Sequence, residues 1–237
     1  MSDIWTMIWK ESKDLIFQGG RAQLIRPLIV VGIMGVALPY RTGLRWLELS
    51  LPVMLVVVLV PFQYIVSIIG DAIAGERERH TLETLLATRI PDRAILLGKV
   101  IVAVGYAWGM ALAGLLLASV VVNLSYGNGS LAFYHPLELF LEALALSFLV
   151  SLLTASAGVL VSLRVATVRQ AQQFLIIGTI VLILGGVLAV SLLPTDLYSS
   201  LSYSQILLVV IAVLAILDAV LLGLSLVSFQ RSRLILS

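Results

Sequence analysis

The chain has 237 residues, of which 60% are hydrophobic and only 12% charged, with a formal net charge of +2. A soluble domain carries about a quarter charged residues, so the composition excludes an ordinary soluble protein and indicates a membrane protein. There is no cysteine, which excludes disulfides, thiolate chemistry and cysteine-based metal sites, and we expect no metal site of any kind.

Residues 1–23 predict an amphipathic helix that lies in the membrane interface. At 100° per residue, the apolar face holds Ile4, Trp5, Ile8, Trp9, Leu15 and Ile16, and the polar face holds Asp3, Thr6, Lys10, Lys13 and Asp14. Such a helix places tryptophan at the depth of the lipid headgroups and lysine toward the lipid phosphates. Two interpretations stay open, a plain membrane anchor or a lever that also contacts a cytoplasmic partner.

Six charge-poor segments follow, and a helix needs about 20 apolar residues to cross the hydrocarbon core. We place the six spans at 24–40, 49–70, 96–124, 137–163, 174–193 and 205–229. The predicted fold is an all-α polytopic membrane protein with one transmembrane domain over residues 1–237.

The distribution of Lys and Arg predicts the orientation of these spans. With six spans, thirteen of the fifteen basic residues fall on the side that holds both termini and the loop 71–95, and only Arg41 and Arg45 fall opposite. Basic residues accumulate on the cytoplasmic side of membrane proteins. We therefore expect a protein of the plasma (inner) membrane with both termini in the cytoplasm.

The loop between the second and third spans is the most informative stretch, since residues 71–99 hold ten of the 28 charges. Helical spacing predicts that Glu76 pairs with Arg79. Thr81 is a candidate N-cap for a second short helix, with Glu83 in its first turn. That helix would carry an apolar stripe of Leu82, Leu85 and Leu86. An apolar stripe beside dense charge favours a helix that docks into a groove of another protein over a solvated connector.

The pattern G-E-R-E-x-x-T-L-E-x-L-L, which begins at Gly75, and the later pair Gly98-Lys99 resemble the loop of type-2 ABC exporter permeases. The layout of an amphipathic N-terminal helix and six spans is similar too. Two positions depart from the family pattern, because His80 stands where glycine is common and Arg89 where proline is frequent.

The resemblance implies that the loop's short helix is a coupling helix, which seats against an ATPase on another chain. The residues that would couple to the ATPase are Glu76, Arg77, Glu78, Arg79, Thr81, Leu82, Glu83, Leu85 and Leu86. The chain itself has no phosphate-binding loop, so ATP and Mg²⁺ would be bound by the partner ATPase and this chain would bind no cofactor. It would not be an enzyme by itself.

The resemblance also implies that one six-span chain forms half of a transporter. Two ATPase copies and a second permease are then expected, the latter either another copy or a sister protein. Membrane lipids are expected to surround the spans, and nothing indicates a nucleic-acid partner.

Polar residues inside the spans are candidates for a transport pathway, because burying them in lipid is costly. These candidates are Asp218, Gln63, Tyr64, Ser147, Ser151 and Thr154. The last three also fit a packing seam of small residues with Gly158, and Asp218 also fits an interhelical hydrogen-bonding group. Glu138 and Glu142, at the outer end of the fourth span, are candidates for an outer vestibule, and they also fit ordinary positions in the membrane interface.

Two other functions are considered. An intramembrane protease is excluded, because no second aspartate lies deep in a span and His80 and His135 lie outside the spans. A stand-alone ion-coupled transporter that uses Asp218 is the alternative. It has no need of a docking helix, so residues 75–99 favour the ATP-driven permease.

Overall fold

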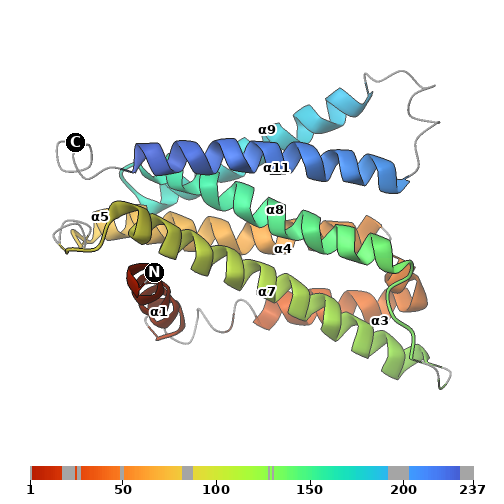
Figure 1. Cartoon of the computed structure of the whole chain (residues 1–237). Coiled ribbons are helices and arrows are strands. Elements are labelled where there is room, and N and C mark those ends of the chain that lie inside the picture. Colours follow the sequence, from red (N-terminus) through yellow and green to blue (C-terminus); the bar gives the residue numbers. More distant parts are fainter. Residues whose placement is uncertain are drawn as a thin grey trace.

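The computed structural model is all-helical in the part of the chain that it describes, which is residues 2–17, 25, 28–48, 51–81, 88–127, 129, 131–191 and 203–229. Four long helices run side by side: α4 (Leu51–Gly70), α7 (Asp92–Tyr126), α8 (Leu137–Ser162) and α11 (Tyr203–Ser228). Helix α9 (Val168–Ser191) packs on α8 and α4. Figure 1 shows these helices as one elongated bundle.

The core lies around α4, which packs against both α7 and α8. Its buried side chains are aliphatic and mostly β-branched, among them Val53, Val57, Ile65 and Ile69. Many apolar side chains elsewhere point outward; Leu188 and Val227, for example, are about 60% exposed. Large apolar residues exposed along long helices are typical of a surface that faces lipid.

Five helical stretches among the described residues are long and apolar enough to cross a membrane: Leu28–Glu48, Val56–Glu78, Asp92–Tyr126, Leu137–Ser162 and Ser204–Ser228. They agree with the first four predicted spans and the sixth. The fifth predicted span, 174–193, overlaps α9, which is not among these five. An integral membrane protein is therefore confirmed, and the count of six spans stays a prediction.

The first stretch is the least regular of the five. A π-helical turn η1 (Ile33–Ala37) leads into the short helix α3 (Leu38–Thr42), and the 3-10 helix η2 (Gly43–Glu48) follows. Gly43 adopts a φ of 63°, which ends α3 at little cost because glycine has no Cβ.

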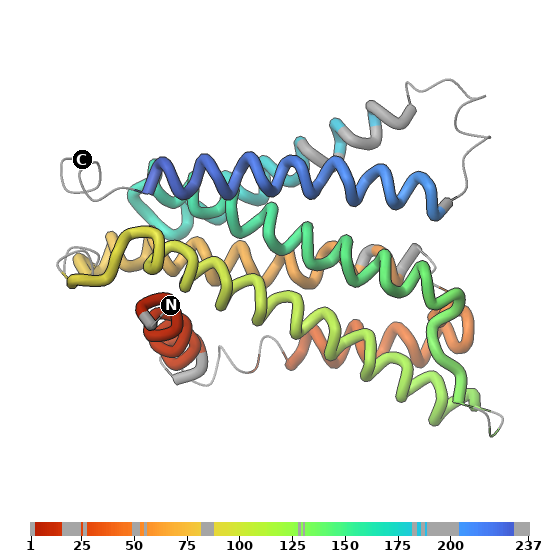
Figure 2. Tube along the Cα trace, in the orientation of Figure 1, coloured from red at the N-terminus to blue at the C-terminus, as the bar shows by residue number. Residues whose placement is uncertain are grey.

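A second π-helical turn, η3 (Asp71–Gly75), joins α4 to the three-residue helix α5 (Glu76–Glu78). A π-turn adds one residue to a helical turn, so it changes the direction in which the following side chains point. In Figure 2, the tube passes from α4 through this turn to the same end of the bundle where α7 begins.

Helix α1 (Ser2–Phe17) confirms the predicted N-terminal helix. It lies across the long helices rather than along them, at the end of the bundle that also holds α5 and the last turn of α11 (Figure 1). It packs on the first turns of α7. The two ends of the described chain therefore lie at the same end of the molecule, as an even number of spans requires.

Candidate functional site: the junction of the signature segment

Residues 75–79, called here the signature segment, connect through four successive side chains to four helices and to the π-turn η3, which follows α4. Each of Glu76, Arg77, Glu78 and Arg79 bonds to a different part of the bundle. The π-turn η3 and the end of α5 point these side chains in different directions. The segment is thus the point where α1, α4, α7, α8 and α9 meet at one end of the molecule.

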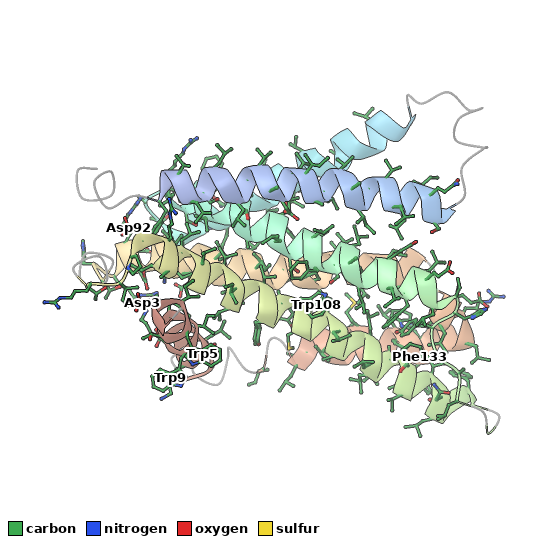
Figure 3. All side chains as sticks on the ribbon, viewed as in Figure 1. Asp3, Trp5, Trp9, Asp92, Trp108 and Phe133 are labelled. Atoms are coloured by element: carbon green, nitrogen blue, oxygen red, sulfur yellow. The ribbon has the colours of Figure 1, made fainter. Side chains whose placement is uncertain are left out.

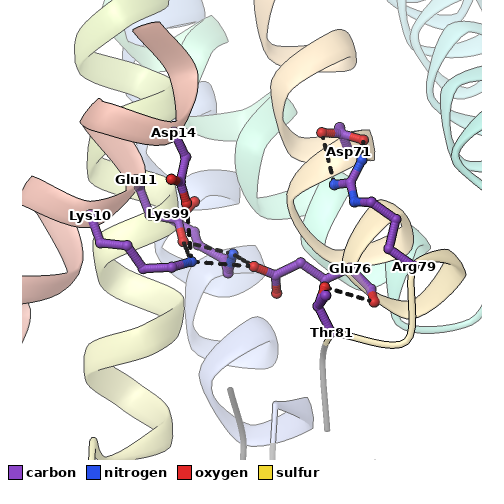
Figure 4. Close-up of polar contacts among 8 residues, drawn as sticks. All are labelled: Lys10, Glu11, Asp14, Asp71, Glu76, Arg79, Thr81 and Lys99. Atoms are coloured by element: carbon purple, nitrogen blue, oxygen red, sulfur yellow. Dashed lines mark hydrogen bonds and ion pairs between the residues drawn. The ribbon is translucent and has the colours of Figure 1, made fainter. Parts of the chain in front are cut away.

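Glu76 belongs to a buried ion cluster that also contains Lys10, Glu11, Asp14 and Lys99, called here the Lys99 cluster (Figure 4). Lys99 Nζ lies 2.8 Å from Glu76 Oε1 and 2.9 Å from Glu11 Oε1. The side chain of Lys99 is only 1% exposed. One ammonium group from α7 therefore joins a carboxylate of α1 to a carboxylate of α5.

Lys10 completes the cluster on its more exposed side. Its Nζ lies 3.1 Å from Glu11, 3.3 Å from Asp14 and 3.6 Å from Glu76. The cluster holds two cations and three carboxylates, so its formal net charge is −1. Buried charges are tolerated when they are paired in this way and are costly when a partner is removed.

The pKa values in α1 follow from these contacts. Burial by itself would raise the pKa of Glu11, but the charges and hydrogen bonds of Lys99 and Lys10 outweigh it and lower the pKa below its ordinary value. Burial would lower the pKa of Lys10, but Glu11, Glu76 and Asp14 outweigh it and raise the pKa. Both groups are therefore charged at neutral pH.

Arg77 and Glu78 bind the ends of α8 and α9. The Arg77 guanidinium donates to the carbonyl of Val165 at 3.0 Å and to that of Leu163 at 3.3 Å, beyond the last turn of α8. A cation is favourable there, because the carbonyl groups of the last helical turn have no partner within the helix. The backbone N–H of Val168, the first residue of α9, donates to Glu78 Oε2 at 3.3 Å. An anion is favourable at a helix N-terminus, because the first backbone N–H groups have no partner within the helix.

Arg79 pairs with Asp71, at 3.1 and 3.2 Å, and not with Glu76 as helical spacing predicted. The prediction was wrong because α5 ends at Glu78, and Arg79 already has the non-helical angles φ −88° and ψ 2°. Its side chain passes over Gly75, where a Cβ would lie 2.3 Å from Asp71 Oδ1. Glycine at this position leaves room for the Asp71–Arg79 ion pair.

The segment ends in a Schellman motif. The N–H of Thr81 donates to the carbonyl of Glu76 at 2.8 Å, and the N–H of His80 donates to that of Arg77 at 3.0 Å. His80 has a φ of 56°, in the left-handed region where glycine is favoured. This geometry accounts for the glycine that the resembled family commonly has here. The Thr81 hydroxyl also donates to the Glu76 carbonyl, at 3.2 Å.

The predicted docking helix lies mostly outside the described residues, and so do four candidate coupling residues on it: Leu82, Glu83, Leu85 and Leu86. The coupling role of these residues stays a prediction.

Helix α1 approaches α7 most closely at Met7 and Gly98. Met7 is fully buried, and a Cβ on Gly98 would lie 2.5 Å from the Met7 Cβ. Trp5 and Trp9 are 69% and 58% exposed and lie on the side of α1 away from α7 (Figure 3). Lys10 and Asp14 were both predicted on the polar face, with the lysine toward the lipid phosphates, and they take part in the Lys99 cluster.

Sequence reasoning missed Glu11 as a site residue and placed Lys99 only at the end of the family pattern. A signal for Glu11 exists, because it is four residues from both Met7 and Leu15 and so shares their helix face. A charge on a face that is otherwise buried requires a partner. No local signal identifies that partner, since Lys99 is 88 positions further along the chain.

The candidate pathway residues are mostly in the packed interior of the chain. Ser147, Ser151 and Thr154 are buried, and the Ser151 and Thr154 hydroxyls donate to carbonyls one turn earlier in α8, each at 2.7 Å. Tyr64 is buried, whereas Gln63 is exposed on α4. A pathway between two permeases would be lined by outward-facing groups, so Gln63 is the candidate best placed for one.

Three further acidic candidates lie on α8 and α11. Glu142 accepts a hydrogen bond of 2.5 Å from the Ser204 hydroxyl, which ties the first turns of α8 and α11 together, and Glu138 is exposed. Asp218 is 2% exposed, and its carboxylate oxygens have no hydrogen-bond partner among the described residues. In the part of the chain that the structure describes, no group of three or more His, Asp or Glu side chains could hold a metal ion.

The long apolar helices and the junction at their common end define a polytopic membrane protein with a site built around one loop. A family model described as "ABC-2 type transporter" matches residues 2–192, and the chain therefore belongs to the ABC-2 type transporter family. Its class is accordingly that of an ABC transporter permease, a membrane transport subunit. No curated protein matches the chain significantly.

Proposed function

We propose that this chain is the permease subunit of an ATP-driven exporter, and that it couples to a separate ATPase through the cytoplasmic segment 75–90. Each chain would form half of the translocation pathway, with a second copy or a sister permease as the other half. ATP and Mg²⁺ would be bound by the ATPase subunits, two per transporter.

The observation that carries the proposal is the set of bonds made by the signature segment. Glu76, Arg77 and Glu78 connect it to α1, α7, α8 and α9, and two of these four partners, α7 and α8, are long and apolar enough to cross a membrane. A solvated connector needs no such bonds. A segment that receives a force from a partner and distributes it to several helices does need them.

The ion-coupled alternative is not favoured. Its only specific support is Asp218, and the membership in the ABC-2 family gives the chain an energy source on another subunit. The signature segment would also have no role in a transporter that works alone.

Affinity purification from native membranes tests the coupling proposal. We expect an ATPase subunit to co-purify with the tagged chain in a stoichiometric amount. The double change Glu83→Arg and Arg89→Glu, in the loop, should remove it. The matched control is Arg41→Glu with Arg45→Glu, at the opposite end of the bundle, which should leave the ATPase bound. A parent protein that purifies without any ATPase would contradict the proposal.

The direction of transport requires a second experiment. Cells that produce the permease and its ATPase are compared with cells in which the ATPase carries an inactivating change. An exporter lowers the cellular content of its substrate, so at least one metabolite should be less abundant with the active pair. A metabolite that is instead enriched by the active pair would indicate import.

A further inference from the structure

Lys99 lies near the beginning of α7, and its side chain is only 1% exposed. Its two carboxylate partners come from other elements, Glu11 from α1 and Glu76 from α5. We propose that Lys99 and Glu11 are positioning residues of the coupling apparatus, which hold α1, the start of α7 and the signature segment together as one moving unit. This inference rests on the proposed function for what moves the unit, but the unit itself is defined by contacts within this chain.

Glu11 and Glu76 share one cation, Lys99. Lys99 Nζ lies within 2.9 Å of both carboxylates, which are each 12% exposed. If α1 moved away, Glu11 would lose the buried Lys99 ammonium group and keep only the more exposed Lys10 of its own helix. If α5 moved away, Glu76 would lose the same group. Since each buried carboxylate needs the pairing, the position of α1 and that of the signature segment are energetically linked.

Lys10 cannot replace Lys99 as the cation that joins Glu11 to Glu76. Its side chain is 40% exposed, and its Nζ is 3.6 Å from Glu76. Exposed ion pairs contribute little, because water and salt screen them. Lys99 therefore carries most of the coupling between the two carboxylates, and Lys10 with Asp14 closes the solvent side of the cluster.

An apolar contact, adjacent to the ionic contact, also holds α1 against α7. Met7 is fully buried against Gly98, the residue before Lys99. The burial of Met7 thus reports whether α1 is docked, at a place that is not itself charged. Removing the ionic contact should expose Met7 if the inference is right.

The chain has no cysteine, so Met7→Cys creates a single reactive thiol in an otherwise intact protein. Its rate of labelling by a water-soluble maleimide is measured on the purified permease alone. In this background, Lys99→Met leaves two carboxylates without their shared cation, and we expect labelling at least tenfold faster. The matched control is Lys13→Met, which removes a cation from the exposed face of the same helix and should leave the rate unchanged. An unchanged rate with Lys99→Met would overturn the inference.

A neutral triple variant separates positioning from folding. Glu11→Gln, Glu76→Gln and Lys99→Met together remove the ionic link but leave no unpaired charge at this point, so the bundle should still fold while labelling stays at least threefold faster than in the parent. If the triple variant labels at the rate of the parent, the unpaired charges caused the fast labelling of Lys99→Met, the ionic link is not what holds α1 and the inference is wrong.

The coupling role is measured on the permease–ATPase complex. In the Met7→Cys background without further changes, the introduced thiol should stay protected both without nucleotide and after trapping with ATP and vanadate, because the unit moves as a whole. Exposure of this thiol on trapping would show that α1 separates from α7, and would overturn the inference. With the triple variant, ATP hydrolysis should continue while the ATPase-dependent change in metabolite content is lost. If the triple variant kept the full ATPase-dependent change in metabolite content, the inference would also be overturned.

The failures of the two proposals are distinguishable. If no ATPase accompanies the parent permease, the proposed function fails, while the labelling of the isolated permease still reports on the link between α1 and the signature segment. If the ATPase is present and Lys99→Met does not accelerate labelling, the positioning role fails and the proposed function stands.

Discussion

At the scale of single residues, the signature segment shows why particular residue types occupy its positions. Gly75 leaves space for the Asp71–Arg79 pair, and Gly98 leaves space for Met7. Glu76, Arg77 and Glu78 each meet a group of opposite charge or a complementary helix end. The segment is therefore specified by contacts with other elements and not by its own helical propensity, because α5 has only three residues.

His80 gives a prediction at this scale. A left-handed conformation costs an L-residue about 1–2 kcal/mol, while glycine loses roughly half to one kcal/mol more conformational entropy on folding than alanine. His80 has a φ of 56° and an exposed side chain. We expect His80→Gly to raise the free energy of unfolding by up to about 1 kcal/mol, and His80→Val to lower it by about 1 kcal/mol or more. Thermal unfolding in detergent measures both, and a lower midpoint for His80→Gly would contradict the argument.

At the scale of elements, α1 is held by one apolar and one ionic contact, both to the first turns of α7. Sequence periodicity identified the helix and placed Lys10 and Asp14 on its polar face, but it did not identify their partners in the Lys99 cluster. The helix has in fact three kinds of surface. One holds exposed tryptophans, one is buried around Met7, and one carries the charges of the Lys99 cluster.

The apolar contact predicts an effect of side-chain volume at Gly98. Gly98→Leu would make the new side chain overlap with that of Met7. The backbone nitrogen of Ile8 is only 3.5 Å from the new Cβ, so α1 itself must move. We expect amide hydrogen exchange in residues 2–17 to become about tenfold faster. Gly109→Leu is the control on the same helix, because nothing lies within 4 Å of a Cβ there. Equal exchange in the two variants would rule out this contact as a determinant of docking.

The ionic contact predicts how the docking of α1 depends on pH. The pKa of Glu11 is below its ordinary 4.5 in the folded protein, so its contribution is present above about pH 4.5 and is lost as pH falls through the lowered value. The pKa of Lys10 is above its ordinary 10.5, so its contribution is present below that pH and is lost as pH rises through the raised value. Labelling of the Met7→Cys variant should therefore be slow and constant from about pH 6 to pH 9, with a labelling reagent whose own pH dependence is measured on an unfolded control. Marked acceleration within that range would contradict it.

At the scale of the whole molecule, the two ends of the bundle are built differently. One end carries α1, the signature segment and the last turn of α11. The other end is closed by bonds between elements, among them Tyr126 to the Tyr40 carbonyl at 2.6 Å and the Asn123 amide to the Ala132 backbone at 2.7 Å. Force applied at the first end would reach the second through the long helices, which the aliphatic core of α4 keeps in register.

The predicted orientation is testable at this scale, again because the chain lacks cysteine. Leu131→Cys, at a residue that is 95% exposed, should react with a membrane-impermeant maleimide in intact cells. Thr6→Cys and a cysteine in place of Ser237 should react only after the membrane is permeabilised, if six spans place both termini in the cytoplasm. Reaction of the Ser237→Cys protein but not of the Thr6→Cys protein in intact cells would show that the number of spans is odd.

The sequence by itself determined the membrane class, the positions of most helices and the segment that carries the site. Hydropathy, helical period and the Gly75 motif are properties of neighbouring residues, so they can be read along the chain. The sequence also identified Glu76, Arg77 and Glu78 as site residues by resemblance, but not what they bind.

Only the tertiary structure decided which charges meet. Glu76 pairs with Lys99, 23 positions away, and Glu11 with the same lysine, 88 positions away. Helical spacing proposed Arg79 for Glu76, because it assumes that the helix continues. The helix ends at Glu78, and the packing of α1 on α7 then brings a buried ammonium group closer than any local partner. Electrostatic partners depend on distance and burial in the folded chain, and neither is a property of the local sequence.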